Sequence, residues 1–280
     1  EFPMTSPFVN TDWLAQHLKD PDVVVVDASW HLPNASRNAQ AEYLAGHIPG
    51  AVFFDIDGIA DTSSELPHML PSPAEFARAV GALGISQDMT IVVYDEVGLF
   101  SAPRAWWTFR SFGAETVVML EGGGPKWRAE KRGTETGLQH REKRRFEANF
   151  DPDAAVDFEA VSANLRSHAA QVVDARPAPR FHGEVPEPRK GLKAGHIPDS
   201  TNVPVSLVTE NGRLKSPETL QAIFAERGVR LDQPIITSCG SGITAVTLAL
   251  ALEQAGAKQV AVYDGSWAEW GARDDAEVES

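Results

Sequence analysis

The sequence predicts an α/β fold made of two tandem domains, each a mainly parallel sheet flanked by helices. Two observations support this prediction. Five sequence blocks occur twice, in the same order and 143 to 149 residues apart. Within each copy, short apolar runs of strand length alternate with stretches of helical length, which is typical of a parallel sheet covered by helices. A chain of 280 residues is long enough for two domains that each bury their own core.

The repeat can be followed block by block. An apolar run that ends in Asp-Ala, residues 23–28, returns at residues 171–175. The turn Gly46-His47-Ile48-Pro49 returns as Gly195-His196-Ile197-Pro198. The other pairs of blocks are residues 70–75 and 214–218, 91–95 and 235–239, and 121–127 and 264–270. A nearly constant period over five blocks indicates two copies of one structural unit.

We assign the copies to residues 4–140 and 153–280, and the polar, charged segment 141–152 to a linker. In the second copy, short apolar runs predict buried strands, and a longer run that is apolar on most faces predicts a helix packed against the sheet. Ser216 followed by Pro217 predicts a helix N-cap and first helical residue. The predicted elements are strands at residues 172–174, 235–238 and 260–263 and helices at 216–226 and 244–254.

Composition excludes several classes of protein. The 25 basic and 39 acidic residues give a net charge of −14, which argues against binding to nucleic acid or to an anionic membrane. The longest apolar runs are too short to cross a bilayer. One cysteine excludes an internal disulfide and every multi-cysteine metal site. No secretory signal is seen, so we expect a cytoplasmic location.

The single cysteine, Cys239, follows the predicted strand 235–238 and precedes the helix that begins near Thr244. The loop between them, Gly240-Ser241-Gly242-Ile243, contains two glycines. Such a loop can point several backbone N–H groups inward, and together with the helix dipole it favours an anion such as a thiolate. We therefore interpret Cys239 as a nucleophile. The alternative is a buried, inert thiol in a tight turn.

These blocks closely resemble the rhodanese superfamily, and within it the tandem-domain 3-mercaptopyruvate sulfurtransferases. The resemblance covers nearly the whole chain. It implies that the first copy is non-catalytic, because Asp95 stands where the second copy has Cys239. The motifs that carry it include Asp27-Ala28-Ser29-Trp30, Gly46-His47-Ile48-Pro49-Gly50-Ala51, Ser101-Ala102-Pro103-Arg104-Ala105-Trp106-Trp107 and Asp264-Gly265-Ser266-Trp267-Ala268-Glu269-Trp270.

The residues of the loop distinguish branches of this superfamily. Members that prefer thiosulfate carry basic residues just after the cysteine, whereas Gly240 and Ser241 are neutral here. A related phosphatase branch needs an arginine six residues after the cysteine, and that position is Ala245. The resemblance thus implies a donor such as 3-mercaptopyruvate, bound by the loop residues Gly240, Gly242, Ile243 and Thr244.

Two arginines match the substrate-binding arginines of the family, Arg180 and Arg189. A guanidinium binds a carboxylate through two parallel hydrogen bonds, so the residue type suits a 2-oxo acid. The alternative is ordinary salt bridging at the surface of an acidic protein.

Ser241 is implied to relay a proton together with a histidine and an acid of the first copy. His47 matches the histidine, but Asn38 stands where the acid is expected, and an amide cannot stabilise an imidazolium as a carboxylate does. His196 lies in the same Gly-His-Ile-Pro turn, so His47 has a structural alternative. Asp27 in the first copy and Asp174 in the second occupy equivalent positions, and both are interpreted as structural.

We therefore expect a sulfurtransferase in which Cys239 takes sulfur from 3-mercaptopyruvate as a persulfide and passes it to cyanide, a small thiol or thioredoxin. No metal or organic cofactor is expected, since the sequence shows no metal-ligand spacing, phosphate loop or dinucleotide motif. The enzymatic alternative is a thiosulfate:cyanide sulfurtransferase. The alternative from another class is a non-catalytic sulfur-carrier or docking module.

Overall fold

The computed structural model describes residues 6–280, so Met4 and Thr5 of the predicted first domain lie outside the described residues. The chain divides into two compact units. The first comprises the residues up to Thr62, Leu70–Asp151 and Asn211–Arg213. The second comprises Ser63–Met69, Pro152–Glu210 and Leu214–Ser280.

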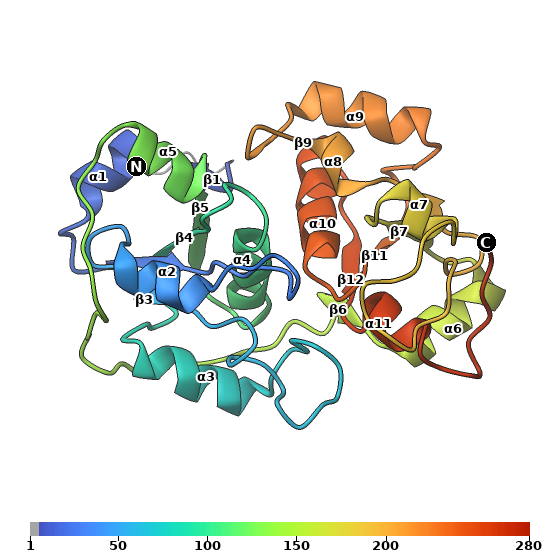
Figure 1. Ribbon diagram of the computed structural model, residues 1–280, viewed down its shortest axis with the longest axis horizontal. Helices are drawn as coiled ribbons and strands as arrows, with labels where there is room; N and C mark the ends of the chain where they lie inside the picture. Colours follow the sequence, from blue (N-terminus) through green and yellow to red (C-terminus); the bar gives the residue numbers. More distant parts are fainter. Residues whose placement is uncertain (1–5) are drawn as a thin grey trace. The chain divides into compact units, whose positions relative to one another are not determined.

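The first unit contains a five-stranded parallel sheet with helices around it (Figure 1). The strand order is β1-β5-β4-β2-β3. The strands are β1 (Phe8–Val9), β2 (Val23–Asp27), β3 (Val52–Phe53), β4 (Thr90–Tyr94) and β5 (Thr116–Leu120). The helices are α1 (Thr11–His17), α2 (Ala39–Ala45), α3 (Pro73–Ala82), α4 (Ala102–Ser111) and α5 (Gly123–Ala129).

The second unit repeats this topology with the strand order β6-β12-β11-β7-β8. Its strands are β6 (Ala155–Val156), β7 (Gln171–Asp174), β8 (Thr201–Asn202), β11 (Ile235–Ser238) and β12 (Val260–Tyr263). Its helices are α6 (Phe158–Ser167), α7 (Ala178–Phe181), α8 (Val205–Val208), α9 (Pro217–Glu226), α10 (Thr244–Ala255) and α11 (Ser266–Trp270). Two further short strands, β9 (Thr209–Glu210) and β10 (Arg213–Leu214), pair with each other. The predicted fold class is confirmed.

The predicted elements of the second copy agree closely with the structure. Strands β11 and β12 have the predicted bounds, and β7 begins one residue earlier than predicted. Ser216 caps α9 by accepting a hydrogen bond from Thr219 N, and Pro217 is the first helical residue. These signals are local in sequence, because a cap and a proline fix the start of a helix whatever packs on it.

The repeat extends to the contacts that hold the segment after the last helix of each copy against the rest of that copy. The indole Nε1 of Trp127 donates to Gly133 O at 2.9 Å, and that of Trp270 donates to Glu277 O at 2.8 Å. The histidine of each Gly-His-Ile-Pro turn forms an antiparallel β-bridge to this segment, His47 with Glu135 and His196 with Glu279. The turn motif therefore has a structural role in both copies.

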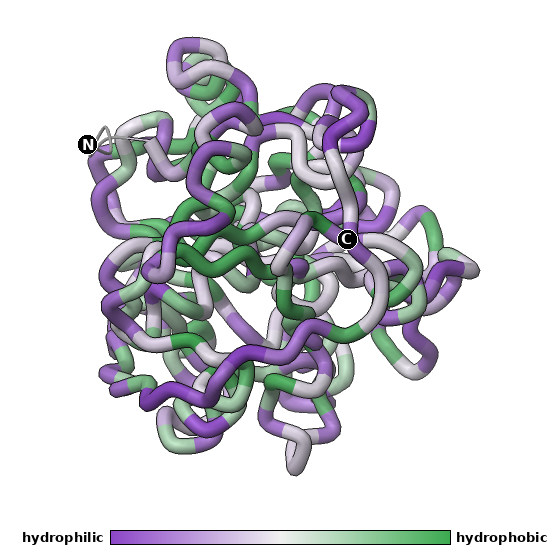
Figure 2. Tube along the Cα trace, turned by 90° about the vertical axis from the view of Figure 1, so that its left-hand side faces the viewer, coloured by the Kyte–Doolittle hydropathy of each residue, from purple (hydrophilic) through white to green (hydrophobic). Residues whose placement is uncertain are grey.

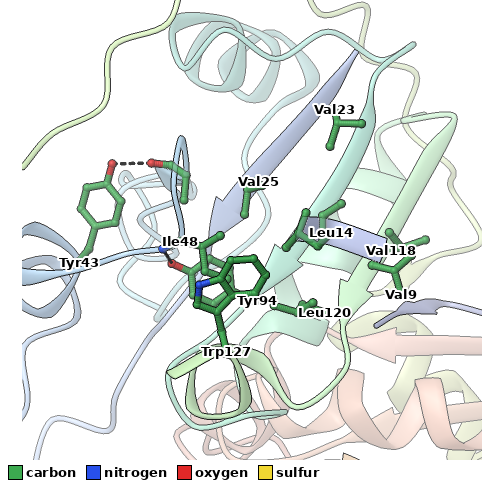
Figure 3. Close-up of a cluster of buried hydrophobic side chains, with 12 residues drawn as sticks. Val9, Leu14, Val23, Val25, Tyr43, Ile48, Tyr94, Val118, Leu120 and Trp127 are labelled. Carbon is green, nitrogen blue, oxygen red and sulfur yellow. Dashed lines mark hydrogen bonds between the residues drawn. The ribbon is translucent and has the colours of Figure 1, made fainter. Parts of the chain in front are cut away.

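Hydrophobic segments lie mostly inside and hydrophilic ones along the periphery (Figure 2). In the first unit a buried cluster joins the sheet to α1 and α5, and Leu14, Val25, Tyr94 and Trp127 belong to it (Figure 3). The central strand β4 and its neighbour β2 are buried along nearly their whole length, which explains their continuous apolar runs. The candidate site lies in the second unit, at the carboxyl end of the equivalent strand β11.

The segment 141–152, predicted as a linker, contains neither helix nor strand. Its residues up to Asp151 nevertheless pack on the first unit. Phe146 is buried, Arg144 N donates to Gly81 O at 3.0 Å, and Asn149 N donates to Phe112 O at 3.0 Å. Within residues 6–280, no helix is long and apolar enough to cross a membrane, and no cluster of three or more His, Cys, Asp or Glu side chains is arranged to hold a metal ion.

Candidate active site

The candidate site is built at the carboxyl end of β11. Ser238, its last residue, pairs with Asp174, the last residue of the neighbouring strand β7. Cys239 follows directly, and α10 begins five residues later at Thr244. Gly242 lies in the left-handed region with φ of +88°, where a side chain would be strained. The loop therefore turns sharply enough to bring the backbone N–H group of Gly242 to the cysteine sulfur.

Cys239 is buried, with 2% of its surface exposed. Its Sγ accepts a hydrogen bond from Gly242 N at 3.1 Å. The start of α11 holds the loop from the other side, since Trp267 N donates to Cys239 O at 2.9 Å and Ala268 N donates to Gly240 O at 2.8 Å. The sulfur thus sits in a cradle whose shape is set by backbone hydrogen bonds, as expected for an anion-binding loop.

Ser266 is a site residue that the sequence analysis missed. Its Oγ accepts from Cys239 N at 3.1 Å and donates to Tyr263 O at 2.8 Å. Its φ is +49°, a conformation that favours glycine, and the corresponding residue of the first copy is Gly123 with φ of +57°. The substitution of serine for glycine between otherwise matching blocks was the signal available in the sequence.

The matching loop of the first copy shows what this geometry binds. The Asp95 carboxylate is fully buried and accepts hydrogen bonds from five backbone N–H groups. The donors are Val97 and Gly98 to Oδ1 at 2.9 and 2.8 Å, and Phe100, Ser101 and Ala102 to Oδ2 at 2.8, 2.9 and 2.8 Å. The loop of the first copy therefore holds an anion of its own, in place of a nucleophile.

Arg180, on α7, extends over the cysteine loop. Its Nη2 lies 2.8 Å from the place where a Cβ on Gly240 would stand, so the glycine leaves room for the guanidinium. Glu187 holds this guanidinium through two hydrogen bonds, from Nε to Oε1 at 3.2 Å and from Nη2 to Oε2 at 2.5 Å. About a fifth of the Arg180 side chain, 21%, is exposed. The structure thus brings Arg180 beside the nucleophile's loop.

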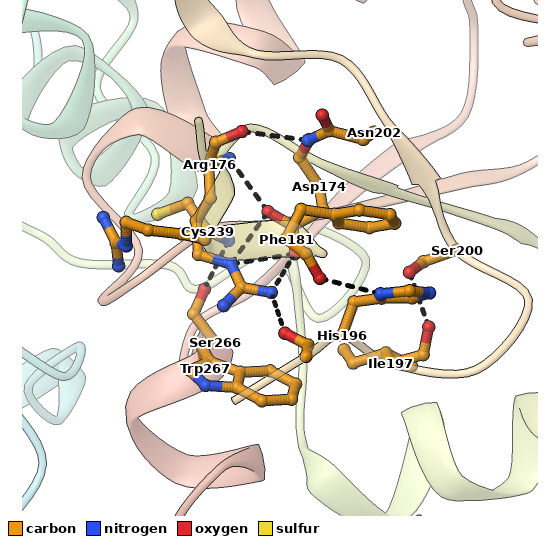
Figure 4. Close-up of polar contacts among 12 residues, drawn as sticks. Asp174, Arg176, Phe181, His196, Ile197, Ser200, Asn202, Cys239, Ser266 and Trp267 are labelled. Atoms are coloured by element: carbon orange, nitrogen blue, oxygen red, sulfur yellow. Dashed lines mark hydrogen bonds and ion pairs between the residues drawn. The ribbon is translucent and has the colours of Figure 1, made fainter. Parts of the chain in front are cut away.

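A buried arginine that the sequence analysis did not single out, Arg176, stands behind Arg180. Its guanidinium contacts Asp174, with Nη2 to Oδ2 at 2.8 Å, and Glu187, with Nη1 to Oε1 at 2.9 Å. It also lies over the indole of Trp267, 4.4 Å from the ring centroid. Figure 4 shows this arginine between Asp174 and Trp267, close to Cys239. Burial lowers the pKa of Arg176, but the two carboxylates outweigh it and leave that pKa raised.

The other predicted residues of this site lie in the same unit. Arg189 is half-buried in the loop that follows α7. Ser241 and Ile243 are buried, with Ile243 at the N-cap of α10 and Thr244 as its first residue. Their roles toward a substrate stay predictions.

His47 belongs to the first unit, where backbone groups surround its ring. Nδ1 lies 2.9 Å from Ile48 O and Nε2 lies 2.9 Å from Gly137 O, and the ring stacks on Tyr43. Asn38 caps α2, its Oδ1 accepting from Ala41 N at 2.9 Å. The side chains at the positions implied for a relay are thus engaged within their own unit, and the catalytic role of His47 stays a prediction.

The two repeated aspartates differ in their surroundings. Asp174 pairs with the buried Arg176, whereas Asp27 has Ser29 at the equivalent position. Both hydrogen bonds from Ser29, from N at 2.9 Å and Oγ at 2.6 Å, go to Oδ1 of Asp27. Burial outweighs these two bonds, which lower the pKa of Asp27, and raises that pKa from its ordinary 3.8 to about 6.

Comparison with known proteins agrees with this arrangement. The family described as rhodanese-like domain matches residues 10–130 and 157–273. The 3-mercaptopyruvate sulfurtransferase of Escherichia coli K12 is 49% identical over 276 residues, covering 98% of each chain. That of Mus musculus is 44% identical over 94% of this chain and 91% of its own length. The thiosulfate sulfurtransferase of Cricetulus griseus is 46% identical, with the same coverage of both chains.

Solved structures give the same result. The crystal structure of SseA from Escherichia coli, described as a 3-mercaptopyruvate sulfotransferase with the rhodanese fold, superposes with a TM-score of 0.87 at 47% identity. The match covers 95% of this chain and 100% of that one. With two matched segments, two equivalent sheets and near-complete coverage by these relatives, the chain belongs to the rhodanese-like family as a member with two copies of the domain.

Proposed function

We propose that the chain is a 3-mercaptopyruvate sulfurtransferase that carries sulfur as a persulfide on Cys239. The observation that carries this proposal is the position of Arg180 over Gly240, at the rim of the loop that holds the Cys239 sulfur. A nucleophile in a backbone cradle can accept sulfur, and a guanidinium beside it can bind the carboxylate of a small 2-oxo acid.

The reaction follows from these groups. The Cys239 thiolate attacks the sulfur of the donor, an S–S bond forms and the C–S bond breaks. The electron pair of the broken bond passes to carbon, so pyruvate leaves as its enolate and takes up a proton. An acceptor such as cyanide then attacks the outer sulfur of the persulfide, and the thiolate is restored. The Gly242 N–H group stabilises the Cys239 thiolate before it attacks the donor and again when the acceptor restores it.

The same loop supports the preference for this donor. The residues after the cysteine add no positive charge, and the Nε and Nη2 groups of Arg180 already donate hydrogen bonds to Glu187. Such a site suits one carboxylate better than the compact double charge of thiosulfate. Thiosulfate remains the second candidate donor, because a thiosulfate sulfurtransferase is among the similar relatives at 46% identity.

The other groups have subordinate roles in this proposal. Arg189 adds a second positive charge toward the donor carboxylate, and Ser241 and His47 are the proposed groups that move the proton to the leaving enolate. Cyanide, small thiols and thioredoxin are the proposed acceptors, and the cytoplasm is the proposed location.

The deciding experiment measures pyruvate release from 3-mercaptopyruvate and sulfite release from thiosulfate on one preparation. We expect a much higher kcat/KM for 3-mercaptopyruvate. Mass spectrometry after donor treatment should find one added sulfur atom on the wild-type protein and none on Cys239→Ser. Efficient turnover of thiosulfate alone would replace this proposal with the second candidate.

A further inference from the structure

Four charged side chains of the second unit form an alternating chain that begins in the interior and ends at the cysteine loop. Asp174 binds Arg176, Arg176 binds Glu187, and Glu187 binds Arg180. The exposed fractions of the first three side chains are 2%, 1% and 2%, against 21% for Arg180. Three members are therefore withdrawn from water, and only the last can meet a ligand.

Glu187 occupies the central position in this chain. Its Oε1 accepts from Arg176 Nη1 at 2.9 Å and from Arg180 Nε at 3.2 Å, and its Oε2 accepts from Arg180 Nη2 at 2.5 Å. Buried carboxylates are costly unless they are paired, and this one is paired twice. Because the buried Arg176 guanidinium holds this carboxylate on one side, the carboxylate can hold a second guanidinium in a fixed position on its other side.

The arginine at the exposed end needs such a support. A free arginine side chain samples many rotamers and loses this conformational entropy when it is fixed. Arg180 must hold one position to leave its Nη1 edge for a carboxylate while its Nη2 stays beside Gly240. Glu187 binds the Nε and Nη2 edge, which sets the plane of the guanidinium.

We propose that Glu187 is a positioning residue for the sulfur donor: held by the buried Arg176, it fixes the guanidinium of Arg180 over the Cys239 loop. It also offsets part of the Arg180 charge, which adapts the site to a single carboxylate. This inference rests on the proposed function, because it takes Arg180 as the group that binds the donor carboxylate.

The test separates donor binding from turnover by using Cys239→Ser, which cannot form a persulfide. Calorimetry measures the affinity of this variant for 3-mercaptopyruvate, alone and combined with Arg180→Ala, with Glu187→Gln and with both. Loss of Glu187 should weaken binding about ten-fold, the effect of one charge-assisted hydrogen bond. In the Arg180→Ala background the same change should have no further effect, because Glu187 acts through Arg180.

The matched control is Glu184→Gln, which removes the same charge from an exposed glutamate three residues away. It should leave the affinity unchanged, which excludes a long-range effect of net charge. Thermal unfolding of each variant tests whether the fold is retained. Should Glu187→Gln unfold, Glu187→Asp keeps the charge with a shorter reach, and a several-fold loss of affinity is still expected.

Steady-state kinetics with an intact Cys239 completes the test. Glu187→Gln should raise KM for 3-mercaptopyruvate with little change in kcat, and thiosulfate turnover should change less. An unchanged affinity, or an equal loss of affinity in the Arg180→Ala background, would overturn the positioning role. If Cys239→Ser binds the donor through Arg180 and Glu187 but the wild type releases no pyruvate, the proposed function fails and the positioning role stands.

Discussion

Replacing Asp27 by asparagine should change how the stability of the protein depends on pH. Asp27 ends β2 in the core of the first unit and is fully buried, and burial raises its pKa from 3.8 to about 6. Between these two pH values the folded protein keeps a proton that the unfolded chain has lost. The carboxyl group therefore favours the folded state below about pH 4, and this contribution disappears as the pH rises through 6.

The size of the effect follows from the shift. About 2.2 pH units at 1.36 kcal/mol each correspond to about 3 kcal/mol of stability lost by pH 8, of which about half is already lost at pH 5. Asparagine keeps the shape and removes the titration. The stability of Asp27→Asn relative to wild type should thus rise by about 1–2 kcal/mol between pH 5 and pH 8, or about 3–6 °C in Tm.

The assay is thermal and urea unfolding of both proteins at several values of pH between 4 and 8. The matched control is Asp174→Asn in the second copy. Asp174 pairs with the buried Arg176, so its loss should destabilise the protein at every pH in this range, by up to about 3–5 kcal/mol. Parallel pH profiles for wild type and Asp27→Asn would refute the reasoning, since they would mean that Asp27 is ionised in the folded protein at no cost.

Three further predictions concern the two loops. Cys239→Ser should abolish sulfur transfer and leave the circular dichroism spectrum and Tm unchanged; turnover near the wild-type rate would exclude Cys239 as the nucleophile. Gly240→Arg should displace the Arg180 guanidinium, because its Nη2 lies 2.8 Å from the place where a Cβ at this position would stand. The value of kcat/KM should then fall for 3-mercaptopyruvate and rise for thiosulfate. An unchanged ratio between the two values would show that the neutral loop does not select the donor. Asp95→Ala should leave five backbone N–H groups without their acceptor, three of them in buried hydrogen bonds, and should cost at least about 3 kcal/mol of stability. Urea unfolding of this variant and of wild type measures the cost, and a loss below about 1 kcal/mol would contradict the prediction.

Sequence alone determined the repeat, the strands and helices of the second copy and the place of Cys239 at the end of β11. These features depend on short-range rules, such as continuous apolar runs for buried strands and Ser-Pro at the start of a helix. Arg180 was also identified from sequence, by the motif around it.

Only the tertiary structure decided what surrounds these residues. Glu187, Arg176 and Ser266 reach the site from segments up to 90 residues apart in the chain, and in the sequence two of them look like ordinary surface charges. Burial turns them into a fixed ion-pair chain and a backbone clamp, because a charge or hydroxyl withdrawn from water must find its partner within the protein. The five N–H groups that bind Asp95 likewise depend on loop geometry. Backbone direction is set largely by packing, and the sequence indicates it only at positions such as Gly242, where a positive φ favours glycine.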